Sequence, residues 1–202
     1  RAMPSSVVQA QPSTTAGMPS IPRLRLAIQN RAHLVLYLRL VLILGALFVF
    51  VYAGTNWINH RRPAGTLYRL FIDAELRIPF VPGMIFVYHS VQLLLFVAPL
   101  LLLEDARLLR LAKAMAAVIV LSGVLFLIFP TALGFPRPAQ VAGYEWIYAK
   151  LYLLDLPHNL APSLHVSLSS LTLLACVGQQ PRWFGFLLWV WLAALSASVR
   201  PL

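Results

Sequence analysis

A serine and a histidine lie two residues apart at the start of an apolar stretch, and their types are suited to phosphate chemistry. The segment reads Asn159-Leu160-Ala161-Pro162-Ser163-Leu164-His165. Proline and serine favour the first turn of a helix, and the unbonded N–H groups of that turn form an anion site. A histidine in the same turn can protonate a leaving oxygen. The segment therefore predicts an anion site with His165 as a general acid.

Arg137 is the second candidate, because it lies in the same predicted loop, 130–163, ahead of this segment. Its planar guanidinium presents several donors that match a phosphate group. We therefore expect Arg137, Asn159 and Ser163 to converge on one anion beside His165. Phosphoryl transfer also needs a nucleophile held by a carboxylate, and residues 1–202 offer no residue in the right place.

The composition indicates an integral membrane protein. Apolar residues make up 60% of the chain, only 11% of residues are charged, and the mean hydropathy is +0.79. No cluster of cysteine and histidine has the spacing of metal ligands, and no glycine-rich phosphate loop precedes a helix. We therefore expect chemistry without a metal or cofactor.

The elements that must position these residues are predicted to be membrane-spanning helices. A helix rises about 1.5 Å per residue, so about 20 apolar residues cross a hydrocarbon layer of about 30 Å. This criterion predicts an all-α, polytopic transmembrane helix bundle with a disordered basic tail at 1–33, one domain at 34–202 and an interfacial helix near 67–76. The five predicted spans are 34–53, 84–103, 111–129, 164–177 and 183–199.

The net charge of +10 comes from basic residues that flank the apolar segments, so anionic lipid headgroups are the expected partner and nucleic acid is not. Basic residues in the short loops after the second and fourth spans, including Arg107, Arg110 and Arg182, place those loops and the N-terminus in the cytoplasm by the positive-inside rule. The loop 130–163 and the site are then expected on the opposite face.

Several short motifs occur in a characteristic order. They are Ile78-Pro79-Phe80-Val81-Pro82 with Tyr88 and Ser90, Phe129-Pro130, Phe135-Pro136-Arg137-Pro138, Asp155, Asn159 and Pro162-Ser163-Leu164-His165. With these motifs the chain, over roughly 40–200, resembles the type 2 phosphatidic acid phosphatase superfamily. It is most similar to the branch of inositol phosphorylceramide synthases and related bacterial membrane phosphatases.

The resemblance implies a role for each site residue. Arg137 and Ser163 bind the phosphate, His165 protonates the leaving group, and a histidine of a third motif attacks phosphorus with help from an aspartate. The family usually has a lysine seven residues before the arginine, where this chain has Pro130. The third motif follows the fifth span in the family. We therefore expect 34–202 to be incomplete at its C-terminal end, with five spans of six, and the native chain to continue past Leu202.

The resulting hypothesis is an integral-membrane lipid phosphatase or phosphotransferase that acts on a lipid phosphate or pyrophosphate through a phosphohistidine intermediate. Two alternatives stay open: a head-group transferase similar to inositol phosphorylceramide synthase, and a non-catalytic membrane protein that binds phospholipids. A transporter is less favoured, because paired intramembrane charges and interrupted helices are absent from the sequence.

Overall fold

The computed structural model describes residues 20–70, 77, 79–133, 137–138, 141–154, 158–177 and 182–199. Within these ranges all regular secondary-structure elements are helices, which confirms the predicted all-α class. An isolated backbone pairing joins Tyr68 to Thr131. The helices are α1 (Ser20–Gln29), α2 (Arg31–His60), η1 (Ala64–Thr66), α3 (Met84–Val97), η3 (Ala98–Leu101), α4 (Asp105–Ile128), α5 (Glu145–Leu154), α6 (Leu164–Val177) and α7 (Arg182–Val199).

Within the described residues, three helices are long and apolar enough to cross a membrane: α2, α3 continued by η3, and α4. The 30 residues of α2 extend about 45 Å at about 1.5 Å per residue. Only 6% of the most apolar window of α2 is buried inside the protein. Such a continuous exposed apolar surface is typical of contact with lipid, so the chain is associated with a membrane. The shorter apolar helices are α6 and most of α7.

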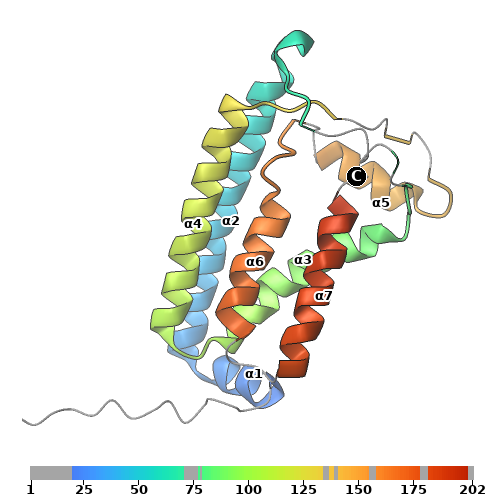
Figure 1. Ribbon diagram of the computed structural model, residues 1–202. Helices are drawn as coiled ribbons and strands as arrows, with labels where there is room; N and C mark the ends of the chain where they lie inside the picture. The colour runs from blue at the N-terminus through green and yellow to red at the C-terminus, as the bar shows by residue number, and fades with distance from the viewer. Residues whose placement is uncertain are drawn as a thin grey trace, which may run out of the picture.

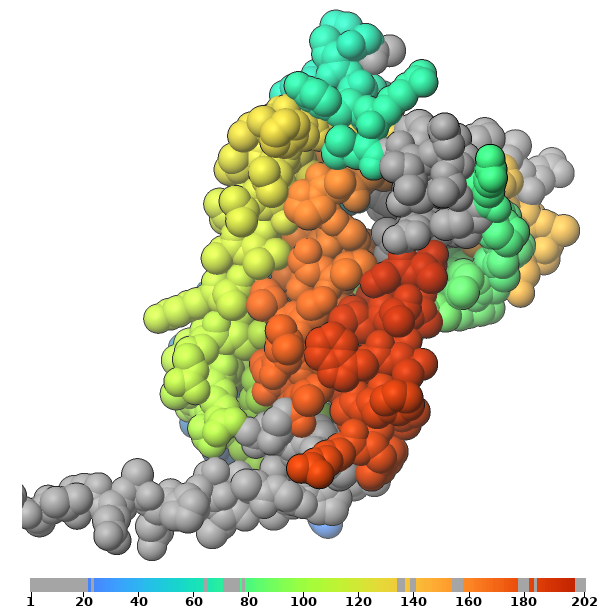
Figure 2. Space-filling view, viewed as in Figure 1, coloured from blue at the N-terminus to red at the C-terminus, as the bar shows by residue number. Residues whose placement is uncertain are grey.

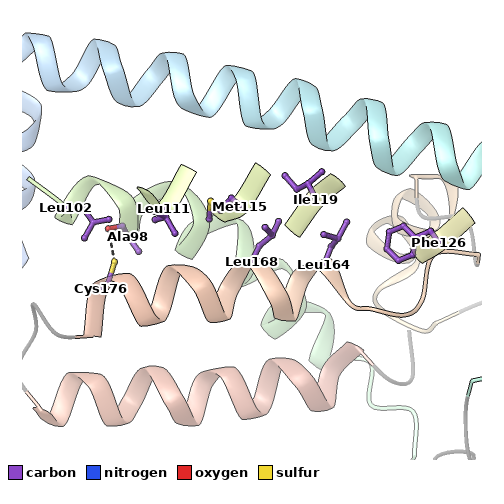
Figure 3. Close-up of a cluster of buried hydrophobic side chains, with 9 residues drawn as sticks. All are labelled: Ala98, Leu102, Leu111, Met115, Ile119, Phe126, Leu164, Leu168 and Cys176. Carbon is purple, nitrogen blue, oxygen red and sulfur yellow. Dashed lines mark hydrogen bonds between the residues drawn. The ribbon is translucent and has the colours of Figure 1, made fainter. Parts of the chain in front are cut away.

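The main hydrophobic core lies where α2, α4 and α6 pack together (Figure 1). At Gly123 of α4, a Cβ atom would clash with Val51 Cγ1 of α2, so the missing side chain permits the close approach of the two helices. The thiol of Cys176 donates to the Ala98 carbonyl at 3.4 Å and closes the end of the cluster (Figure 3). The buried residues of this core are Ala98, Leu102, Leu111, Met115, Ile119, Phe126, Leu164, Leu168 and Cys176.

On the other flank of α6, α7 packs against α6 and α3. Figure 2 shows α4, α6 and α7 side by side on one face of the molecule. The indole Nε1 of Trp191 donates to Ser90 Oγ at 2.8 Å and joins α7 to α3. Leu173 and Leu195 are fully buried at this contact. Helix α6 is therefore enclosed on several sides, which fixes the position of the residues in its first turn.

Apart from shifts in the bounds of the long helices, the structure differs from the predictions in three segments. Helix α1 lies inside the predicted disordered tail 1–33, because the buried Ala27 lets this helix pack on α2 and η3; residues 1–19 lie outside the described residues. The predicted interfacial helix is wrong over 67–70, where Tyr68 pairs with Thr131 instead, and 71–76 are not described. Helix α5 lies in the segment that we expected to be a loop.

Candidate functional site

The predicted helix start at the Pro-Ser-x-His segment is confirmed. Leu164 is the first residue of α6, and the Ser163 hydroxyl accepts a hydrogen bond from the Val166 backbone N–H at 3.4 Å. The Ser163 carbonyl accepts from the Ser167 N–H and hydroxyl at 3.0 and 2.8 Å. Ser163 is thus the N-cap of the helix, and Pro162 precedes the cap rather than following it.

His165 lies in the first turn of α6 and is partly buried against α3. Its ring centroid lies 4.5 Å from that of Tyr88, with the two planes inclined by 42°. Tyr88 itself belongs to a buried hydrophobic cluster that includes Ile85, Tyr148 and Leu151. The aromatic contact holds the imidazole at a defined place beside the N-terminus of α6.

A groove of about 630 Å³ contains His165 in its wall. The helices α2, α3, α5 and α6 all contribute to this wall, so residues far apart in the sequence meet there. Two of the lining side chains, Val49 and Trp146, are 62% and 65% exposed, which shows that the groove opens at the surface of the bundle. Its lining residues are Phe48, Val49, Tyr52, Ala53, Tyr88, His89, Gln92, Trp146, Ile147, Lys150, Leu151 and His165.

Arg137 lies at the edge of the same aromatic cluster. Its guanidinium carbon is 4.8 Å from the centroid of the Tyr152 ring on α5, and Tyr152 lies 5.7 Å from Tyr148, centroid to centroid. Tyr148 donates its phenolic hydroxyl to the Pro82 carbonyl at 3.1 Å, and burial raises its pKa to about 12. Arg137 and His165 therefore border one cluster of packed tyrosines from α3 and α5.

Two further histidines lie near Arg137, at the ends of α2 and of the loop before α6. His60 Nδ1 and His158 Nε2 are 3.3 Å apart, and His158 Nδ1 lies 3.4 Å from the Thr131 carbonyl oxygen. The pKa of His158 lies below its usual value, mainly because of burial and further because of the neighbouring His60 and Arg137. His158 is consequently held largely neutral at physiological pH.

Asn159 occupies a different environment from the one that we expected for a substrate-binding residue. Its amide nitrogen donates to Thr55 Oγ1 at 2.7 Å and to the Tyr52 carbonyl at 3.1 Å. Its amide oxygen accepts from Asn59 Nδ2 at 3.2 Å, and Asn59 also donates to the Phe126 carbonyl at 2.9 Å. These bonds fasten the loop before α6 to α2 and, through Asn59, to α4.

The structure thus joins Ser163 and His165 on one helical turn and brings Arg137 to the adjoining tyrosine cluster, whereas Asn159 is directed into the α2 contact. Asp155 lies outside the described residues. Sequence reasoning missed α5 and with it Trp146 and Lys150. The sequence did contain a signal, because Trp146, Ile147, Lys150 and Leu151 follow the spacing of one helical face.

Chemically, the arrangement combines a titratable imidazole, a helix N-terminus and a nearby guanidinium next to an apolar groove. Such a combination suits a ligand with an anionic head and a hydrocarbon tail. No family model, curated protein or solved structure matches this chain. The motifs and this geometry therefore carry the functional argument.

Proposed function

We propose that this chain belongs to an integral-membrane lipid phosphatase or phosphotransferase that cleaves a lipid phosphate or pyrophosphate through a phosphohistidine intermediate. The observation that carries the proposal is the place of His165, in the first turn of α6 and in the wall of a groove that opens on the apolar surface of the bundle. A lipid can enter such a groove sideways, with its hydrocarbon staying in an apolar environment throughout.

The chemistry then divides between binding and proton transfer. Arg137 and the N-terminal turn of α6 stabilise the charge on the phosphoryl oxygens. A histidine nitrogen attacks phosphorus, the bond between phosphorus and the lipid oxygen breaks, and His165 gives its proton to that oxygen. The resemblance assigns this attack to the histidine of the family's third motif, which has no counterpart within residues 1–202. Water then attacks the phosphohistidine, with the now neutral His165 as base, and releases phosphate.

The proposal includes a topology. We infer that α2, α3 with η3, α4, α6 and α7 are five spans of a helix bundle, with α5 lying near one membrane surface. The 14 residues of α6 extend about 21 Å, shorter than the hydrocarbon layer, so the first turn of α6 would lie close to the headgroups. A phosphate that stays in the headgroup region could then reach His165.

The central test replaces His165 by alanine in the native full-length protein, reconstituted in phosphatidylcholine nanodiscs with phosphatidic acid as substrate. Loss of the general acid should reduce phosphate release by at least about 100-fold, the usual contribution of such a group. Gel filtration and thermal unfolding serve as folding controls. Undiminished release by a folded His165→Ala protein would exclude the proposed mechanism.

A second variant, Arg137→Lys, tests the guanidinium. Lysine keeps the charge but loses the planar fork of donors, so turnover should fall by about tenfold. Arg61→Lys is the matched control, because Arg61 also stacks on an aromatic ring, with its guanidinium carbon 3.3 Å from the Trp57 centroid, but is not part of the tyrosine cluster that adjoins His165. Equal effects of the two changes would remove Arg137 from the site.

The same assay separates the alternatives. Ceramide is added as acceptor, together with phosphatidylinositol as donor. A phosphatase should release phosphate from phosphatidic acid as before and leave the ceramide unchanged, whereas a head-group transferase would convert phosphatidylinositol and ceramide into inositol phosphorylceramide and diacylglycerol. Tight binding of phosphatidic acid without either product would favour a non-catalytic lipid-binding protein.

A further inference from the structure

Lys150 is the one residue with a fixed charge among the described side chains that line the groove, and that lining contains no carboxylate. It projects from α5 one turn after Trp146, with Nζ 5.3 Å from the centroid of the Trp146 ring. The same groove wall contains His165 and the apolar residues Phe48, Val49 and Ala53 of α2. A cation and a titratable histidine thus share the wall of a largely apolar groove.

Lys150 is exposed, so its ammonium group is accessible to an anionic group that enters the groove. An ammonium group is a compact point charge with three donors, which suits a phosphate oxygen. The apolar wall on α2 suits a hydrocarbon chain, and the volume of about 630 Å³ lies within the range of about 300–1,000 Å³ typical of sites for one small ligand. Head and tail of one anionic lipid therefore match the two parts of the groove.

We propose that Lys150 binds the headgroup phosphate of a lipid whose chain lies along α2 in this groove, and thereby presents the phosphate to His165. The proposal rests on the proposed function in taking the groove as the substrate site. Lys150 would be a substrate-binding residue on α5, and it would make the groove selective for lipids with an exposed phosphate over neutral lipids.

Trp146 offers a direct readout of occupancy, because it lines the groove next to Lys150. Bromine on an acyl chain quenches tryptophan fluorescence on contact. The protein in phosphatidylcholine nanodiscs is titrated with brominated phosphatidic acid, brominated phosphatidylcholine or brominated diacylglycerol. The contribution of Trp146 is the quenching that is lost in a Trp146→Phe variant measured in parallel.

We expect phosphatidic acid to quench Trp146 at a lower mole fraction than either other lipid. Lys150→Met should raise the half-saturating mole fraction about tenfold, as for one lost charge-assisted bond. Lys150→Arg should restore most of the preference. Lys113→Met is the matched control, because Lys113 is equally exposed on α4 and does not line the groove. Lys150→Gln replaces the methionine variant if the latter does not fold.

The outcomes separate this inference from the proposed function. An undiminished preference in Lys150→Met, or equal quenching by all three lipids, overturns the role of Lys150 even if phosphate is released. A preference that depends on Lys150, in a protein that releases no phosphate, supports the binding role and overturns the phosphatase. Relief of the quenching by inorganic phosphate would show that the anion competes with the lipid headgroup, and would support a phosphate site at Lys150.

Discussion

His158 is a titratable residue whose environment favours the neutral form. Burial lowers its pKa from 6.5, and the charges of His60 and Arg137 lower it further, against the partial opposition of the Thr131 carbonyl. The unfolded chain therefore binds more protons than the folded chain once the pH falls below about 6.5. This contribution to stability is complete above that pH and is lost progressively as the pH falls toward the folded-state pKa.

We predict that the melting temperature of the protein falls on acidification from about pH 8 to about pH 5, and that it falls less in His158→Gln, which cannot take up the proton. Thermal unfolding in detergent at several pH values measures the melting temperatures of the unsubstituted protein and of His158→Gln. An identical pH dependence in the two proteins would show that other groups cause it.

Asn59 and Asn159 form the polar connection between the site loop and the long helices. The Asn59 side chain is 0% exposed, and the two amides share a hydrogen bond. Removal of one partner leaves buried groups unsatisfied, so Asn59→Ala and Asn159→Ala should each cost about 1–2 kcal/mol of unfolding free energy. The double variant should cost less than the sum of the two, because both changes break the same bond.

A matched control for these asparagines is Thr66→Ala, which removes an exposed hydroxyl bonded to the Pro63 carbonyl and should change stability by less than about 0.5 kcal/mol. If Asn159→Ala instead left stability unchanged and weakened substrate affinity, the substrate-binding role predicted from the sequence would be right.

At the scale of elements, the contact between α2 and α4 depends on the absence of a side chain at Gly123. A methyl group there would clash with the stiff, β-branched side chain of Val51, so this side chain or one of the two helices must move. We predict that Gly123→Ala lowers the unfolding free energy by about 1–3 kcal/mol.

Gly45→Ala is the control for this prediction, because nothing lies within 4 Å of its added Cβ on the same helix pair. It should stabilise α2 by up to about 1 kcal/mol. Thermal unfolding of both variants, and of Gly123→Ala combined with Val51→Ala, checks the argument. A combined variant no more stable than Gly123→Ala would show that Val51 is not the obstacle.

Helix α5 is the element that gives the site its second wall. Tyr148 anchors it to the segment before α3 through the Pro82 carbonyl, and Leu151 packs on the cluster that includes Tyr88. This packing places Trp146 and Lys150 in the wall of the groove that also contains His165. The groove is thus a property of four elements together, and none of them forms it alone.

At the scale of the whole molecule, the long helices leave their ends on two opposite faces. The His33 imidazole and the Asp105 carboxylate, 2.6 Å apart, join the starts of α2 and α4 on the face that carries α1. The loops around the candidate site lie at the other ends of α2 and α4 (Figure 1). The orientation predicted from the basic residues of the short loops places the face that carries α1 in the cytoplasm.

This orientation can be tested with cysteines on the two faces. Thr66→Cys, beyond the end of α2, should react with a membrane-impermeant maleimide on intact cells, whereas Ala106→Cys, in the first turn of α4, should react only after permeabilisation. The unsubstituted protein is the control, because its buried Cys176 should stay unlabelled. The reverse pattern would invert the topology, and labelling of both in intact cells would contradict membrane crossing by α2 and α4.

The sequence alone determined the helical class, the places of the long apolar helices and the start of α6. These features follow from local rules. A segment that crosses a hydrocarbon layer must form a continuous helix, because its backbone groups find no water there. A serine directly before an apolar helix can cap the N-terminus of that helix. The segment 164–177 was accordingly predicted with the bounds that α6 has.

Only the tertiary structure decided the existence of α1 and α5, the packing role of Asn159 and the groove beside His165. Short helices such as α5 gain most of their stability from the surface on which they pack, which periodicity over ten residues does not reveal. Asn159 and Asn59 are 100 residues apart in the chain, so their bond depends on how α2, α4 and α6 come together. The site residues are local in sequence, but the surface that selects their ligand is formed by distant segments.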